Sequence, residues 1–343
     1  MAKYSNVKKP AFFIPFMDYA QSIGSVVYQD NELNDIHLLN PAKTHKITPD
    51  EGWWETGEIR YDINFNSSIS YQTISDSDGY IYIFILGHNL NTADCSIEIR
   101  LEEILDPNLS ISAGTIEREK IVNDLGDNSA PEYNGFSIIK AKYSISTFKG
   151  LRIIIKGFSS DSNNEIKIGS VSLCSKWNPP HNPDLSLKMS RQYDGVRTTR
   201  TRGGATLSDA SYTRGGTFWA NSNAWELTDS GLDSRTLGRR IWDMNFSYLT
   251  PANIMPEFES LDYYETEYND NLDKSIQTSQ SFFARVLNRV QGSHLPFIFL
   301  PNDTDPNYNP DQWAICRFEQ KDFSITQAAP ELYSLSMKLT ESW

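Results

Sequence analysis

The feature that most constrains this sequence is a series of strand-length apolar runs, each bounded by Gly, Asn, Asp or Ser. Residues 80–86 form a near-continuous apolar run, which suits a central strand buried on both faces or in the core of a sandwich. Residues 58–65 alternate between apolar and polar, as a half-buried strand does. Four further runs follow, at residues 96–101, 136–143, 151–158 and 166–174. This pattern predicts a mainly β chain whose first domain, residues 28–176, is an antiparallel sandwich or jelly roll.

Composition narrows the class of protein further. Aromatic residues make up 12% of the chain, which is typical of a globular protein and not of a disordered one. The three cysteines are an odd number without a CxxC motif, so we expect buried thiols in a protein made inside a cell rather than a disulfide framework.

Charge and hydropathy exclude two kinds of partner. The formal net charge is −13, and a general nucleic-acid binder needs clustered cations instead. No apolar run approaches the roughly 20 residues of a membrane helix, so we expect no membrane insertion. Lysines precede the apolar stretch at 11–17, but Pro15, Asp18 and the lack of a cleavage site argue against a signal peptide. We expect synthesis in the cytosol, with residues 1–27 as an N-terminal arm in which 12–23 form an apolar arm or short helix.

A proline-rich segment, Trp177-Asn-Pro-Pro-His-Asn-Pro183, marks a change in character. Prolines cannot continue a sheet ladder, so residues 177–184 are predicted to be a stiff linker to a second domain at 185–343. Residues 188–240 contain nine Lys or Arg and five acids. Two helices are predicted in this domain. One, near 251–264, begins at Thr250-Pro251, and one at 276–290 ends at Gly292.

No motif predicts catalysis, a cofactor or a metal site. The five histidines show no i, i+4 pair or Cys/His cluster, and there is no nucleophile elbow or P-loop. Asp76-Ser-Asp-Gly79 has the alternating carboxylates of a calcium loop without its later ligands, so a hairpin turn is the better interpretation. His88 follows the 80–86 run, in a turn or in a ligand-contacting loop. We therefore expect a protein that is not an enzyme.

The arginines at 197, 200 and 202 precede a Gly-Gly pair. They fit a solvated loop or hairpin. Alternatively, they make an electrostatic contact with an acidic partner, and another copy of this acidic chain would be such a partner.

The C-terminal half, residues 185–343, contains a distinctive ordered set of segments. These are the glycine turn Arg202-Gly-Gly-Ala-Thr206, the charged and aromatic run Arg239-Arg-Ile-Trp242-Asp-Met-Asn-Phe246-Ser-Tyr-Leu249, a helix from Pro251, Pro296-Phe-Ile-Phe-Leu-Pro301, Trp313-Ala-Ile-Cys-Arg-Phe318, and a strand ending in Leu339-Thr-Glu341. As an ordered set they resemble the distal tail and related baseplate proteins of tailed bacteriophages.

The resemblance implies a tail-tube-like β-barrel with two helices at 185–343 and a structural virion protein of the tail, made in the host cytoplasm. It implies a homo-oligomeric ring, a trimer or hexamer, that joins the tail to other baseplate and host-attachment components. The residues expected at the assembly interface are Arg200, Arg202, Arg239, Arg240 and Trp242.

The first domain is similar to the galactose-binding-like (discoidin-like) jelly rolls of phage tail proteins. The stretches that carry this similarity are Tyr80-Ile-Tyr-Ile-Phe-Ile-Leu-Gly-His-Asn-Leu90 and Ile168-Gly-Ser-Val-Ser-Leu173. It implies an alternative function, a carbohydrate-binding module for host attachment that contacts a surface glycan. The candidate contact residues are Trp53, Trp54, Tyr80, Tyr82 and His88. A glycan depolymerase is a third alternative, although no repeat typical of such enzymes is present.

Overall fold

The structure is a computed structural model, and the residues that it describes are 7–18, 26–28, 36–39, 45–47, 58–91, 93–102, 117–123, 129–156, 166–193, 196–210, 239–256, 279–304 and 312–342. Strands dominate these residues, as the sequence predicts. The first half contains β1 (Ala11–Pro15), β2 (Val26–Tyr28), β3 (His45–Ile47), β4 (Glu58–Ser70), the 3₁₀ turn η2 (Tyr71–Thr73), β5 (Tyr80–His88), β6 (Ser96–Glu102), β7 (Glu117–Val122), β8 (Gly135–Lys142), β9 (Thr147–Lys156), β10 (Ile166–Ile168) and β11 (Ser170–Trp177). The second half contains β12 (Lys188–Gln192), β13 (Val196–Arg200), β14 (Thr206–Ala210), β15 (Arg239–Leu249), α3 (Pro251–Ile254), η4 (Phe283–Leu287), α5 (Asn288–Val290), β16 (Phe297–Leu300), β17 (Ala314–Phe318), β18 (Ile325–Ala329) and β19 (Leu332–Glu341).

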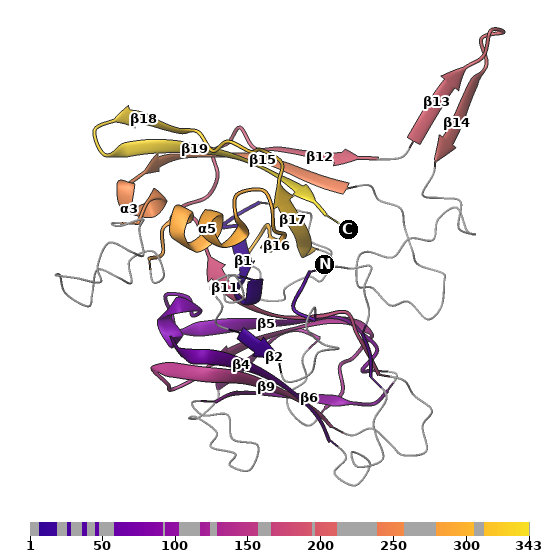
Figure 1. Cartoon of the computed structure of the whole chain (residues 1–343). Coiled ribbons are helices and arrows are strands. Elements are labelled where there is room, and N and C mark those ends of the chain that lie inside the picture. Colours follow the sequence, from indigo (N-terminus) through magenta and orange to yellow (C-terminus); the bar gives the residue numbers. More distant parts are fainter. Residues whose placement is uncertain are drawn as a thin grey trace.

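One large antiparallel sheet runs through both halves of the chain (Figure 1). Its strand order is β12-β15-β19-β17-β16-β1-β11-β5-β8-β7, and β18 pairs with β19 beside this path. Strands β12 and β7 lie at opposite ends of the order, so the described strands form an open sheet and not a closed barrel.

Strand β1 lies in the middle of this sheet, between β16 and β11. The sequence predicts an arm or short helix for these residues, and that prediction is wrong for 11–15: all five are buried in a strand. The strand is buried on both faces. Phe12 packs in one core and Phe13 in the core on the opposite face, so the run has no polar position to reveal a strand.

The first half contains a two-sheet sandwich. A four-stranded sheet of order β2-β4-β9-β6 lies over the β11-β5-β8-β7 part of the large sheet (Figure 1). Alternating isoleucines of β5, β6 and β9 fill the space between the two sheets and form one buried cluster with residues of β8 and β11. Strands β3 and β10 form a separate two-stranded pair.

The second half buries one face of its sheet beneath a short helix. Phe282, Val286 and Val290 pack with aromatic and aliphatic residues of β15, β16, β17 and β19. The helix runs through η4, which is a wide π turn, and α5. It ends at Gln291 and Gly292, both left-handed with φ of 52° and 68°, as the predicted glycine stop requires.

Both predicted helices are shorter where the structure describes them. Residues 279–281 are not helical, so the second helix begins later than the predicted start at 276. Residues 276–278 lie outside the described residues. Helix α3 starts at Pro251 after Thr250 as predicted and spans four residues; positions 257–264 lie outside the described residues. None of the helices that the structure describes combines the length and apolar character needed to span a bilayer.

The proline-rich connection after β11 contacts the body of the protein at several points. The Asn178 side chain donates a hydrogen bond to the Pro10 carbonyl at 3.0 Å, and the Asn182 side chain accepts one from the Lys9 backbone at 2.8 Å. The Asp184 carboxylate accepts a hydrogen bond from the Ser247 hydroxyl at 2.6 Å. These contacts hold the connection against the residues that precede β1 and against the last residues of β15.

Candidate functional site

The arginine-rich segment forms a two-stranded hairpin that we call the arm, residues 196–210. Strands β13 and β14 pair in register, with Arg200 opposite Thr206. Its turn contains Gly204, which has a left-handed φ of 84°. The Thr201 hydroxyl accepts a hydrogen bond from the Ala205 backbone across this turn at 3.1 Å. The arm projects away from the rest of the molecule (Figure 1). Every side chain from 196 to 208 is exposed, so the hairpin predicted around Arg200 and Arg202 is confirmed as a local structure.

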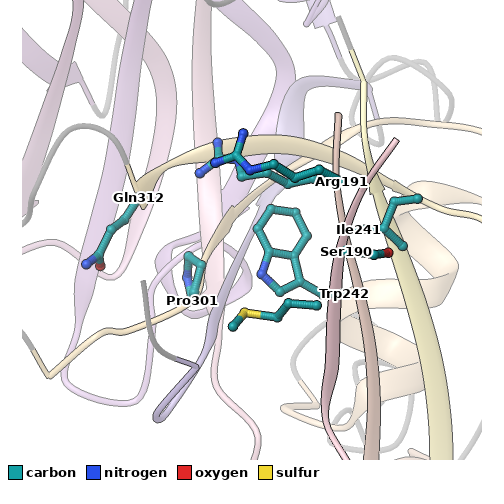
Figure 2. A pocket seen from close by; sticks show the side chains of 8 residues that line it. Ser190, Arg191, Ile241, Trp242, Pro301 and Gln312 are labelled. Atoms are coloured by element: carbon teal, nitrogen blue, oxygen red, sulfur yellow. The ribbon is translucent and has the colours of Figure 1, made fainter. Parts of the chain in front are cut away.

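A cavity of about 260 Å³ lies where β12 meets the first residues of β15. Figure 2 shows Trp242, Arg191 and Pro301 on one side of the two strands, and Ser190 and Ile241 on the other. Of the described residues that line it, Ser190, Gln312 and two arginines are polar and the rest are apolar. Its apolar members are Met189, Ile241, Trp242 and Pro301. We call this cavity the β15 pocket. It brings together two predicted interface residues, Arg240 and Trp242.

Arg240 is held by an acid from the last strand. Its guanidinium donates to Glu341 at 2.7 Å (Nη2 to Oε1) and 3.1 Å (Nε to Oε2), and to the Trp313 carbonyl at 2.8 Å. The guanidinium also lies 5.4 Å from the Trp242 ring centre, within cation–π range. Arg240 is therefore a wall of the pocket with its charge balanced inside the chain.

The pocket has a polar group without a partner. Gln312 is 4% exposed, and its Oε1 has no hydrogen bond to any residue that the structure describes. This oxygen is inaccessible to solvent, so it is an unsatisfied acceptor inside the protein and not an open part of the pocket surface. Trp242, 3% exposed, packs on Phe299 at 5.1 Å between ring centres, so this predicted interface residue is almost wholly buried where it lines the cavity. Arg239, half-buried, pairs in register with Gln192 beside the pocket.

The opposite end of β15 presents an exposed aromatic ring. Tyr248 is 76% exposed and has a φ of 61° in a bulge between Phe246 and Leu249. A left-handed conformation costs a bulky residue about 1–3 kcal/mol. Leu185, fully exposed, follows Asp184, whose carboxylate binds Ser247. Leu185 and Tyr248 are both exposed apolar side chains, and we call Tyr248 the knob.

The predicted glycan contacts do not form one exposed group. Tyr82 is 2% exposed and donates its hydroxyl to Asp76 at 3.0 Å. His88 is fully buried against the Ser137 hydroxyl at 2.9 Å, and burial lowers its pKa to about 3. Lys140 lies over the ring of half-buried Tyr80, 3.8 Å from its centre. Neither Tyr82 nor His88 can reach a sugar in this structure, and Trp53 and Trp54 lie outside the described residues.

The acidic loop at 76–79 is a hairpin turn, as the sequence favours. The Asp76 carboxylate accepts hydrogen bonds from the backbone of Asp78 at 3.0 Å and Tyr80 at 2.8 Å, and Gly79 is left-handed. Among the described residues, no three His, Cys, Asp or Glu gather where they could hold a metal ion. The cysteines are buried free thiols, as predicted.

Sequence reasoning missed the knob and the unpartnered Gln312. A signal for the knob is present in the sequence. The buried side chains of β15 are spaced by two at Trp242, Met244 and Phe246, then by three to Leu249. Such a break in alternation indicates a bulge, where one extra residue is turned outward.

Comparisons with known proteins found no match for the chain among family models, curated proteins or solved structures.

Proposed function

We propose that this chain is a structural virion protein of a tailed bacteriophage, a distal-tail or baseplate ring subunit. The second half, in this proposal a tail-tube-like barrel completed within the ring, forms the ring itself. The first half, a galactose-binding-like jelly roll, projects outward to other baseplate components. The ordered motifs at 202–341 supply the link to phage tails, and the arm supplies the geometric support.

The arm is the single observation that carries an assembly role. An isolated two-stranded hairpin is marginal in water, and a third strand or a packed face is what normally stabilises one. The arm instead extends from the body with Val196 43% and Leu207 60% exposed. A neighbouring subunit would cover these side chains.

Charge supports a second copy as that neighbour. Arg197, Arg200 and Arg202 are exposed on the arm, in a chain of net charge −13. Oppositely charged surfaces guide association and fix its geometry. A basic arm on an acidic subunit is therefore complementary to the body of another copy.

The experiment is the native mass by light scattering, over a range of chain concentrations. The wild-type chain is expected to form a closed multiple of 39.1 kDa, three- or six-fold. Changing Arg197, Arg200 and Arg202 to Glu is expected to yield monomers of unchanged thermal midpoint, because the arm lies outside the cores.

A matched control carries Lys46→Glu, Lys149→Glu and Lys321→Glu, three exposed lysines elsewhere on the chain. Both triple variants change the net charge by six, from −13 to about −19. The control is expected to assemble. A wild-type chain that stays at 39.1 kDa at every concentration, and also with its virus's other tail proteins, contradicts the proposal.

A further inference from the structure

The arm presents cations and an apolar side chain together. Arg200 and Arg202, at its turn, are exposed. Asp209, the one acid of the arm, lies opposite Arg197 in the register and away from the turn. Leu207 is 60% exposed. A partner that binds the end of the arm must therefore supply both negative charge and apolar area.

One segment of the chain has the composition that such a partner needs. Residues 257–273, which we call the acidic segment, contain seven acids and no Lys, Arg or His, so their formal charge is −7, more than half of the −13 of the whole chain. No other 17 consecutive residues of the sequence reach this charge. The acids are Glu257, Glu259, Asp262, Glu265, Glu267, Asp270 and Asp273.

The acidic segment is also rich in aromatic residues. It contains Phe258, Tyr263, Tyr264 and Tyr268. A guanidinium binds a carboxylate through charge-assisted hydrogen bonds and also binds the face of an aromatic ring. Aromatic rings bury large apolar areas in interfaces. Both kinds of side chain in the acidic segment are therefore complementary to the arm.

The arm and the start of the acidic segment lie at opposite ends of one sheet. Strand β15 begins at Arg239, opposite Gln192, and ends at Leu249, just before α3. Its eleven residues span roughly 33 Å. The arm projects beyond one end of this sheet and α3 lies at the other (Figure 1). The acidic segment follows α3 directly in the sequence, so an outward-pointing arm is placed to reach the segment of a neighbouring copy.

We propose that the arm of one copy binds the acidic segment of the next copy. Arg200 and Arg202 pair with its carboxylates, and its aromatic rings cover Leu207. The inference rests on the proposed function, since it names the contact that joins neighbouring ring subunits. Each copy offers one arm and one acidic segment, so the contacts propagate in one direction and close into a ring when the rotation allows.

Neutralising the acidic segment tests the contact. A variant with Glu257→Gln, Glu259→Gln, Glu265→Gln and Glu267→Gln keeps the size of the side chains and removes four charges. The chain concentration at which rings dissociate, measured by light scattering, is expected to rise about tenfold from the loss of four exposed charge pairs. At about 1 M salt the wild type and this variant should dissociate at similar concentrations, because the attraction is screened in both.

A matched control neutralises four exposed acids elsewhere in the chain. Its changes are Asp94→Asn, Glu132→Gln, Asp322→Asn and Glu331→Gln. Both quadruple variants change the net charge from −13 to −9. The control should not raise the dissociation midpoint, and an equal rise in both variants overturns the contact. Far-UV circular dichroism of each variant checks that its strands are retained.

Exchanging the charges tests whether the contact joins two copies. One variant carries Arg200→Glu and Arg202→Glu, and a second carries Glu265→Lys and Glu267→Lys. Each alone should be monomeric at a concentration where the wild type forms rings, whereas a chain with all four changes should assemble again. An equimolar mixture of the two double variants should also assemble, into rings with an even number of subunits in which the two chains alternate.

The outcomes separate this inference from the proposed function. Rings that are lost on reversing the arm charges and kept on neutralising the acidic segment overturn this segment as the partner of the arm and leave the ring subunit intact. A four-change chain that stays monomeric overturns the pairing of these charges. A mixture that stays monomeric while the four-change chain assembles overturns the contact between copies. A wild-type chain that never assembles removes the proposed function and this inference together.

Discussion

Arg285 is a buried cation that ties the helix of the second half to the sandwich of the first. It is fully buried, and its guanidinium donates to three carbonyls of one turn, those of Gln72, Thr73 and Ser75. Its Nε donates to the Gln280 side chain at 3.1 Å. Burial lowers the pKa of Arg285 to about 10, so the side chain is still charged at neutral pH.

The informative change is Arg285→Met, which keeps an unbranched apolar stem in place of the arginine stem and removes the guanidinium donors. The Thr73 carbonyl retains a hydrogen bond from Arg289 at 2.8 Å, whereas those of Gln72 and Ser75 lose their donor. Each buried acceptor left unpaired costs about 1–3 kcal/mol. Methionine also avoids the cost of burying a charge, which offsets part of this loss. We expect the free energy of unfolding to fall by about 2 kcal/mol, or about 3 °C in thermal midpoint for a chain of this length.

The assay is thermal and urea unfolding at one chain concentration, with Arg317→Met as the control. Arg317 is also an arginine that donates to a backbone carbonyl, that of His294, but this hydrogen bond is exposed. The control is expected to lose less than about 0.5 kcal/mol. A loss in Arg285→Met no larger than in the control would refute the argument that this turn depends on the buried guanidinium.

Three further predictions concern other buried groups. The pKa of His88 is about 3 in the folded protein and 6.5 in the unfolded chain, so the unfolded chain binds more protons below pH 6.5. The free energy of unfolding should therefore fall by about 2 kcal/mol from pH 8 to pH 5. His88→Gln should remove this fall from the pH profile measured by urea unfolding. Burial raises the pKa of all three thiols, to about 12 for Cys95 and Cys174, so a thiol reagent at pH 8 should label none in the native protein and three in denaturant; rapid native labelling would contradict their burial. Glu341→Gln leaves the Arg240 charge unbalanced beside the β15 pocket and should lower the free energy of unfolding by about 1–2 kcal/mol in the same urea titration, whereas no change would mean that solvent already screens the pair.

Local pattern in the sequence locates most strands but not their neighbours. The apolar run at 80–86 is part of β5, and the alternating segment at 58–65 is part of β4. Both are predictable because a continuous apolar run indicates a strand buried on both faces, and alternation indicates a strand buried on one. The same reasoning already argues against Tyr82 as a glycan contact, since a strand buried on both faces cannot display its rings. Asp76 satisfies the Tyr82 hydroxyl, which lets a polar aromatic stay inside.

The candidate site is harder to predict, because its residues come from distant parts of the chain. Arg240 and Glu341 are 101 positions apart, and register places them together only once β15 and β19 are paired. The sequence selects Arg240 and Trp242 from a charged and aromatic strand without showing that one is neutralised and the other buried. The exposed arm is easier, since a Gly-Gly turn between polar strands needs no distant partner.

The position of β1 has a consequence for how the chain is made. Its neighbour β16 begins with Phe297, so nearly 290 residues must be synthesised after Ala11 before that edge of β1 can be paired. At about 5–20 residues per second, this interval is on the order of 15–60 s. During that time a strand of sequence AFFIP, which ends up buried on both faces, has at least one unpaired edge on the nascent chain. The pairing of β1 with β16 must therefore wait until residues 297–300 have been synthesised, so a strand in the middle of the sheet is completed late in folding.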